Sequence, residues 1–342
     1  MTIAKLLLGP IALLAVITIS PPVRALDATQ LAIVINSNDP LSVQVGEYYA
    51  AQRRISFQNI IRIALPPDKT QLTRQEFEDI KLIIDAKAMR TVQAFALAWT
   101  TPYRVECMSI TSAFAFGYDP AFCEPGCKPT RPSPYFNTRS QRPFSHFGIR
   151  PAMLIAGTSF EQAKELIDRG VAADGTFPEG TAYLLSTSDS IRNVRSSFYP
   201  ATMRVLAEGK TKAFTIKQNQ LKYVHDVLFY ITGMANVAGL ETLKFVPGAI
   251  ADHLTSSGGY LTESTGQMSA LRWLEAGATG SYGTVVEPCN LPPKFPNPAV
   301  LATRYLKGDT LIEAYWKSVA MPGQGVFIGE PLAAPFRAKK LD

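Results

Sequence analysis

Short apolar runs alternate with amphipathic segments along most of the chain. The apolar runs have the length of strands, and helix-start signals follow several of them, such as Asp39 before Pro40 and a capping box of Thr73 with Glu76. This alternation predicts an α/β fold in which a mostly parallel sheet is flanked by helices. We expect strands at residues 31–35, 60–65, 92–99, 153–156, 182–185, 226–232, 249–251, 281–287 and 325–328.

The alternation is interrupted at about residues 115–151. This segment is rich in proline, aromatic residues, serine and arginine, and it has little periodicity. We interpret it as a long insertion or as an arm that covers part of the surface. The rest of the chain has no internal repeat and no hinge-like linker, which favours a single domain over residues 26–342.

Residues 1–25 have the three parts of a secretory signal peptide. Lys5 supplies the positive charge, residues 6–19 form an apolar stretch, and cleavage is expected after Ala25. A membrane anchor is the alternative, but a spanning helix needs about 20 apolar residues. This stretch is shorter and is interrupted by glycine and proline. We therefore expect a periplasmic or secreted protein that is not an integral membrane protein after cleavage.

The charge pattern argues against a nucleic-acid partner. The chain has 34 lysines and arginines against 28 aspartates and glutamates, a formal net charge of +6. These charges are spread out, without a long basic run and without aromatic residues interleaved along a basic stripe, which nucleic-acid binding favours. The mild basicity indicates a solvated surface.

The chain has four cysteines, at positions 107, 123, 127 and 289. In an exported protein an even number of cysteines favours disulfides, and four cysteines allow three pairings. The short spacing makes Cys123 with Cys127 the expected local pair, which leaves Cys107 with Cys289. Free thiols are the alternative. A metal site is not expected, because no second Cys or His pair follows at the spacing of a zinc finger.

Ligands of open α/β sheets bind beyond the carboxyl ends of the strands, and this rule selects several polar loops. An acid, an imidazole and hydroxyl groups in one loop have the chemistry of general acid–base or nucleophilic catalysis. The candidate catalytic residues are Asp252, His253, Ser256 and Glu287, and the candidate binding residues are Asp39, Arg104, Thr255 and Ser257.

Each candidate also has a structural interpretation. Asp39 is suited to cap a helix, Asp252 with His253 to form a structural hydrogen-bonding pair, and the Ser-Ser-Gly-Gly run at 256–259 to form a turn. The sequence has no Gly-x-Ser-x-Gly elbow, no phosphate-binding loop and no His-Glu-x-x-His motif. Whether the protein is an enzyme therefore stays open, and no cofactor is expected.

Several stretches resemble an uncharacterised family of exported bacterial proteins found in species that carry the exosortase protein-sorting system. The resemblance spans nearly all of the chain after residue 25, and it implies no known activity. The stretches that carry it are residues 35–42 (INSNDPLS), 48–54, 170–177, 226–230, 247–259 (PGAIADHLTSSGG), 266–270, 277–288 (GATGSYGTVVEP) and 329–332.

The order of the late strands and the ending at residues 325–332 (GVFIGEPL) are also similar to the gingipain-type domain of the caspase-like cysteine peptidases. That resemblance implies a three-layer fold with a His-Gly after one strand and a nucleophilic Cys after the next. The matching positions, near 232–235 and 251–254, lack both residues. We therefore expect no thiol-peptidase activity. The favoured function is binding of a peptide, glycan or envelope partner in the cleft, and the alternative is a hydrolase that uses the loop at 252–257.

Overall fold

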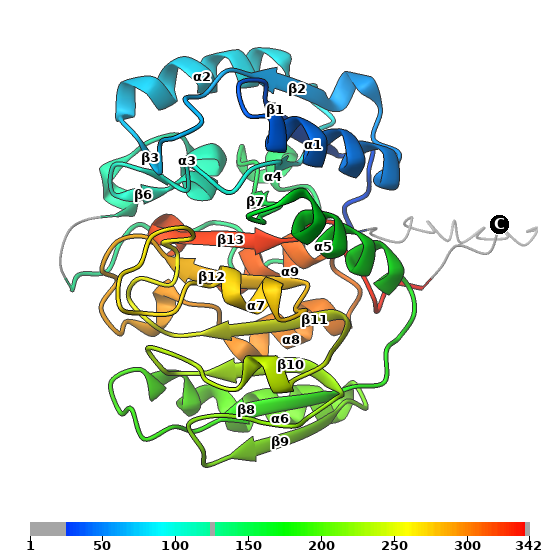
Figure 1. Cartoon of the computed structure of the whole chain (residues 1–342), viewed down its shortest axis with the longest axis vertical. Helices are drawn as coiled ribbons and strands as arrows, with labels where there is room; N and C mark the ends of the chain where they lie inside the picture. The colour runs from blue at the N-terminus through cyan, green and yellow to red at the C-terminus, as the bar shows by residue number, and fades with distance from the viewer. Residues whose placement is uncertain (1–24, 124–126, 339–342) are drawn as a thin grey trace, which may run out of the picture.

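The computed structural model describes residues 25–123 and 127–338, so nearly all of the predicted signal peptide lies outside the described residues (Figure 1). A ten-stranded sheet forms the centre, in the order β2-β1-β4-β7-β13-β12-β11-β10-β8-β9. Its strands are β1 (Leu31–Asn36), β2 (Ile60–Ile63), β4 (Ala94–Leu97), β7 (Ala152–Leu154), β8 (Thr181–Leu185), β9 (Lys212–Ile216), β10 (Val227–Thr232), β11 (Phe245–His253), β12 (Gly280–Thr284) and β13 (Gly325–Gly329).

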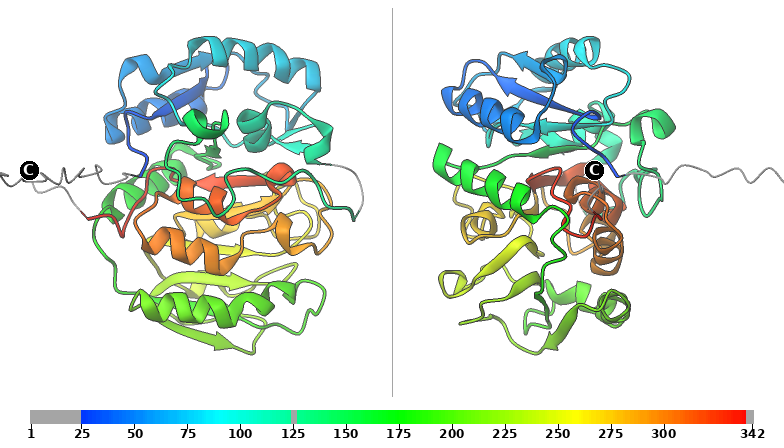
Figure 2. Two further views of the ribbon diagram at one scale, coloured as in Figure 1. Left: turned by 180° about the vertical axis from the view of Figure 1, so that it is seen from behind. Right: turned by 90° about the vertical axis from the view of Figure 1, so that its right-hand side faces the viewer.

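Helices cover both faces of this sheet, as Figure 2 shows. On one face lie α1 (Pro40–Arg53), α5 (Phe160–Ala173) and α7 (Leu271–Glu275), and on the other lie α6 (Tyr199–Glu208), α8 (Pro298–Leu306) and α9 (Leu311–Ser318). The remaining helices are α2 (Arg74–Lys87), α3 (Ile110–Phe116) and α4 (Pro143–Phe147), and a small sheet joins β3 (Gln71–Leu72), β5 (Arg104–Val105) and β6 (Met108–Ser109).

The expected fold class is confirmed: this is a three-layer α/β architecture around a large, mostly parallel sheet. Every residue of β1 and of β10 is buried, because both faces of the sheet are covered. The exception to parallel pairing is β13, which runs antiparallel to β12 and pairs with β7 through Ile328 and Leu154. The last strand of the described chain therefore lies in the middle of the sheet.

Two strand predictions need correction, for different reasons. The strand β9 was not expected, because it lies at the edge of the sheet and its residues are exposed or half-buried, so that it lacks an apolar run. The strand β11 was expected only at 249–251, but it extends from Phe245 to His253. Its last two residues are polar and buried, which the hydrophobic pattern alone does not reveal.

Part of the segment at 115–151 packs as an arm along α9. The backbone N–H of Ser133 donates to the carbonyl of Ala320, and that of Asn137 donates to the carbonyl of Lys317. The Tyr135 side chain between them is fully buried. Over residues 133–137, hydrogen bonds to the α9 region and the buried Tyr135 ring therefore hold the arm, and α4 lies further along the same segment.

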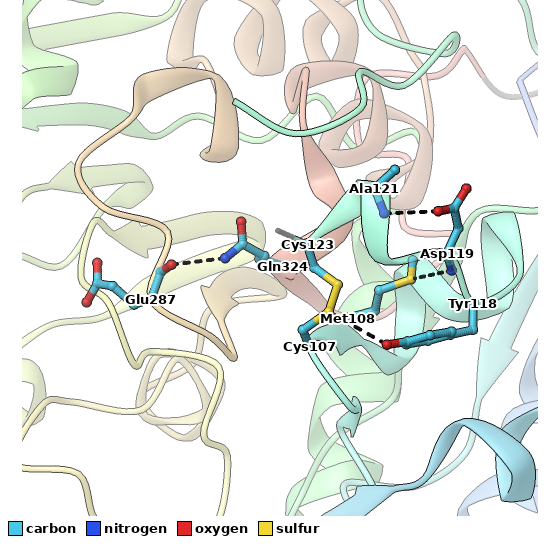
Figure 3. The surroundings of a disulfide bond; sticks show 8 residues. All are labelled: Cys107, Met108, Tyr118, Asp119, Ala121, Cys123, Glu287 and Gln324. Carbon is cyan, nitrogen blue, oxygen red and sulfur yellow. Dashed lines mark hydrogen bonds between the residues drawn. A yellow bond between two sulfur atoms is a disulfide. The ribbon is translucent and has the colours of Figure 1, made fainter. Parts of the chain in front are cut away.

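The disulfide pairing differs from the expected one. Cys107 bonds to Cys123, and Cys127 bonds to Cys289, so the expected pairs Cys123–Cys127 and Cys107–Cys289 are wrong. Figure 3 shows the first bridge beside Gln324, whose amide donates to the backbone carbonyl of Glu287 at 3.0 Å. Cys123 lies directly after a short 3₁₀ turn, and the N–H of Asp119 at the start of that turn donates to the sulfur of Met108 in β6. This contact brings Cys123 to Cys107 and leaves Cys127 for the distant Cys289.

No helix within the described residues is long and apolar enough to span a membrane.

Candidate functional site

The loop expected to begin at Asp252 begins two residues later, because β11 continues through His253. The Asp252 side chain is 1% exposed and forms an ion pair with Arg195, from the turn after β8, with 2.5 Å between Oδ1 and Nη1. The other terminal nitrogen of Arg195 donates to the carbonyl of Thr232, the last residue of β10. Burial raises the pKa of Asp252, and the guanidinium opposes this effect. Asp252 therefore connects two strand ends inside the core.

The imidazole of His253 is buried, and both of its nitrogens have partners. The indole N–H of Trp273 donates to Nδ1 at 2.9 Å, so the ring proton is on Nε2, which donates to the carbonyl of Met268 at 3.0 Å. Burial lowers the pKa of His253 to about 4, which keeps the ring neutral. In this arrangement neither nitrogen is left to accept a proton from a ligand.

Replacing His253 with alanine should lower the free energy of unfolding by about 1–3 kcal/mol, because Trp273 and Met268 both lose a buried partner. The pKa of His253 in the folded state, about 4, lies below its ordinary value of 6.5. Its contribution to stability is therefore complete above about pH 6.5 and is lost as the pH falls toward 4. Urea denaturation at several pH values measures this.

The His253→Ala variant should not show this loss of stability at acidic pH. A His253→Ala protein as stable as the wild type at every pH, but unable to bind its ligand, would contradict the structural role.

A pocket of about 240 Å³ brings together three of the predicted residues, Thr255, Ser256 and Glu287. They come from the segments that follow β11 and β12, which are neighbouring strands in the sheet. The pocket thus lies beyond the carboxyl ends of two neighbouring strands, where the strand-end rule expects a ligand to bind. Its other lining residues are Ile191, Arg192, Leu254, Cys289, Asn290 and Phe295.

Arg192 is held in a fixed orientation at the wall of this pocket. Its Nη1 lies 2.9 Å from Oδ2 of Asp189, and its Nε donates to the hydroxyl of Thr255 at 3.2 Å. That hydroxyl in turn donates to the side-chain carbonyl of Gln267 at 2.5 Å. Within the described residues Nη2 of Arg192 makes no hydrogen bond, and the side chain is 24% exposed. The pocket thus contains a cation whose free N–H groups are already oriented.

The prediction from sequence missed Arg192, although a signal was present. Arg192 lies in the polar segment after β8, which is the neighbour of β10 in the sheet. The same strand-end rule that selected Thr255 applies to this segment. The sequence pattern does not single out Arg192, because the end of β8 has no conspicuous cluster of acids or histidines.

Glu287 belongs to a turn that the second disulfide holds in place. Its Oε1 accepts a hydrogen bond from the backbone N–H of Cys289 at 2.7 Å, and Cys289 has the left-handed backbone angle φ of 52°. Because Cys289 is bonded to Cys127, the turn is attached covalently to the arm. Glu287 therefore has a structural partner for one oxygen, while its exposed carboxylate also borders the pocket.

The other predicted binding residues lie outside the pocket. The backbone N–H of Ser257 donates to Gln267. Arg104 donates to the hydroxyl of Tyr260 at 2.7 Å and to the carbonyl of Val285 at 3.2 Å, so it braces the loop after β12. Asp39 caps α1 by accepting from the N–H of the second residue of that helix. Four strands separate β1, which precedes Asp39, from β11.

Comparisons with known proteins add little to this description. No protein-family model matches the chain, and no curated protein matches it in sequence. A solved structure described as a protease matches with a TM-score of 0.43 and 11% sequence identity, over 91% of this chain and 79% of that one. The function is therefore argued from the geometry of the pocket.

Proposed function

We propose that this is an exported binding protein whose pocket beyond β11 and β12 holds a peptide segment that carries a carboxylate. The signal-like pattern of residues 1–25 supports export. Two disulfides support it as well, since such bonds persist in oxidising compartments outside the cytoplasm. The resemblance to exported proteins of species that carry the exosortase system belongs to the same proposal.

The observation that carries the proposal is the fixed guanidinium of Arg192. An arginine with oriented N–H groups recognises carboxylates by charge-assisted hydrogen bonds. The hydroxyl of Ser256 and the amide of Asn290 line the same pocket and add neutral donors. The ligand's acidic group is thus expected to lie against Arg192.

Apolar side chains complete the pocket and favour a peptide as the ligand. Leu254 and Phe295 are buried in its wall, and Ile191 at its rim is 64% exposed. A peptide offers an apolar side chain beside a carboxylate. Glu287 supplies an acceptor for a backbone N–H of such a peptide.

Binding is favoured over hydrolysis by the state of His253. A hydrolase in this loop needs a base within reach of its nucleophile, and both nitrogens of this imidazole are already used inside the core. The cysteine at the pocket, Cys289, is bonded to Cys127 and is no thiolate nucleophile in that state.

A peptide-library binding experiment tests the proposal. Peptides with acidic side chains or a free carboxyl end should be enriched on the wild-type protein, and Arg192→Met should weaken their binding by tenfold or more, about 1.4 kcal/mol. The matched control is Arg272→Met, which removes an arginine that pairs with Glu275 at 2.6 Å on the surface of α7. That variant should bind as the wild type does.

Two results would contradict the proposal. One is equal binding of acidic peptides by the wild type and Arg192→Met. The other is cleavage of the library by the wild type but not by Ser256→Ala, which would favour the hydrolase.

A further inference from the structure

We propose that the α-ammonium group created by cleavage after Ala25 becomes an internal ion-pair partner of Glu313. Signal-peptide removal then completes a buried charge cluster at the start of α9. The inference rests on the proposed export of the protein, and it concerns a part of the molecule separate from the peptide-binding pocket.

The backbone nitrogen of Leu26 already lies against this carboxylate. Leu26 is fully buried, and its N–H donates to Oε2 of Glu313 at 3.1 Å. On its other side, Nη2 of Arg337 donates to the carbonyl of Leu26 at 2.9 Å. Leu26, whose nitrogen cleavage would convert to an ammonium group, is therefore held in place by two contacts with residues distant in sequence, one at its nitrogen and one at its carbonyl.

Glu313 is built into the fold as an acceptor. It is fully buried, and its Oε2 also accepts from the backbone N–H of Thr310 at 3.0 Å and from the Thr310 hydroxyl at 2.8 Å, in the capping box of α9. Its second oxygen, Oε1, is buried and has no hydrogen-bond partner within the described residues. An acceptor left without a partner at this depth costs free energy.

The buried charges around Glu313 do not balance. Lys317 lies 2.8 Å from Asp309 and 3.6 Å from the free Oε1 of Glu313, and all three side chains are buried. Two carboxylates thus share one ammonium group. Burial raises the pKa of Glu313, as expected for a carboxylate short of a cation.

Two further cations lie near the cluster, and each of them donates to a neutral carbonyl. Arg304 donates to the carbonyl of Asn137, and Arg337 donates to that of Leu26. The Tyr135 ring packs against the ammonium group of Lys317. A cation at the Leu26 nitrogen would lie in direct contact with Oε2 of Glu313, a contact that neither arginine makes among the described residues.

Cleavage supplies such a cation without moving the chain. In the uncut chain the Leu26 nitrogen is a peptide N–H, which has one proton and no net charge. After cleavage the same nitrogen carries a full charge and three protons, and the volume that Ala25 occupied becomes free. The added protons can then reach Oε1 of Glu313 as well as Oε2. The processed protein should be more stable than any form extended at this end.

The test compares three proteins released from cleavable fusions: residues 26–342 with a native Leu26 end, the same chain with this end acetylated, and residues 25–342. An amine-reactive reagent at neutral pH should label the Leu26 amine at least about a hundredfold more slowly in the folded than in the unfolded protein. The acetylated and extended forms should melt several degrees lower.

A second pair of variants distinguishes the ion pair between Leu26 and Glu313 from a general effect of the added residue at the N-terminus. Glu313→Gln should remove the difference in melting temperature between the 26–342 and 25–342 proteins. Glu78→Gln, which removes an exposed partner of Arg74, should preserve it. Equal melting temperatures of the three forms, or a Leu26 amine that is labelled at the unfolded rate, would overturn the inference and leave the proposed function unaffected.

A further measurement uses the protein recovered after export. Mass spectrometry of material recovered after export should find Leu26 as the first residue. A first residue elsewhere would overturn both the cleavage site and this inference, and an uncut chain retained in the cell would overturn the proposed export.

Discussion

Replacing Arg195 with methionine should lower the free energy of unfolding by about 3–5 kcal/mol, because it leaves the Asp252 carboxylate buried without its partner. For a domain of this size the loss corresponds to a melting temperature lower by roughly 5–8 °C. The effect should be large because the guanidinium also donates to the carbonyl of Thr232, at the end of β10. Thermal and urea denaturation of the variant measure the loss.

The loss in free energy of unfolding of the Arg195→Met variant should increase as the pH rises. Burial already raises the pKa of Asp252, and removing Arg195 removes the charge that opposes this effect. A carboxyl group with a raised folded pKa destabilises the protein when it ionises, so the penalty is absent below its unfolded pKa of about 3.9 and grows as the pH rises. The difference from the wild type should therefore be smallest near pH 4 and largest at neutral pH and above.

The double variant Arg195→Met with Asp252→Leu is the matched control. It removes both charges and replaces them with apolar groups of similar volume, which is often close to neutral in stability. It should recover more than half of the loss and show no pH dependence from this site. A double variant no more stable than Arg195→Met alone would mean that packing, and not the unpaired carboxylate, causes the loss.

Removing the Cys127–Cys289 bridge should be the other large effect. Its cysteines are 162 residues apart, against 16 for Cys107–Cys123. In the chain-entropy description the longer loop contributes about 5 kcal/mol and the shorter about 3 kcal/mol. The Cys127→Ser/Cys289→Ser protein should therefore unfold at lower urea concentration than the Cys107→Ser/Cys123→Ser protein, which serves as its matched control.

The two double variants should also differ in ligand binding. Cys289 lines the pocket, and its backbone N–H donates a hydrogen bond to the carboxylate of Glu287. Loss of its bridge should weaken peptide binding even where the protein remains folded, whereas loss of the Cys107–Cys123 bridge should not. Disulfide mapping by mass spectrometry checks the pairing itself. Finding Cys123 bonded to Cys127 would contradict the basis of the comparison.

Local patterns were sufficient to predict most of the architecture. The buried apolar runs and the capping residues Asp39, Thr73 and Ser159 located the helices α1, α2 and α5 and the strands before them. These signals depend on neighbours along the chain, which a sequence displays directly. The edge strand β9 was not predicted, because an exposed strand does not need an apolar run.

The site was predicted only in part, because its character depends on contacts between distant residues. Thr255, Ser256 and Glu287 share a pocket because β11 and β12 are adjacent, which the strand-end rule anticipates. The burial of Asp252 and His253 depends on partners at 195 and 273, and nothing in the local sequence announces those partners. A polar pair at the end of a strand looks the same whether it faces solvent or the core.

The prediction of the cysteine pairing was wrong for a related reason. Proximity along the chain favoured Cys123 with Cys127, but the arm at 115–151 carries Cys127 to the turn after β12. The path of an irregular arm is set by its anchors, such as the buried Tyr135, and not by periodicity. Sequence spacing therefore says little about which cysteines meet.

The central place of β13 has a consequence for the timing of folding. This strand joins β7 on one side and β12 on the other, yet among the described residues it is the last strand to be synthesised. Until it arrives, the two halves of the sheet have open edges and no strand to link them. The sheet therefore cannot be completed until β13 is available, however early the other strands form.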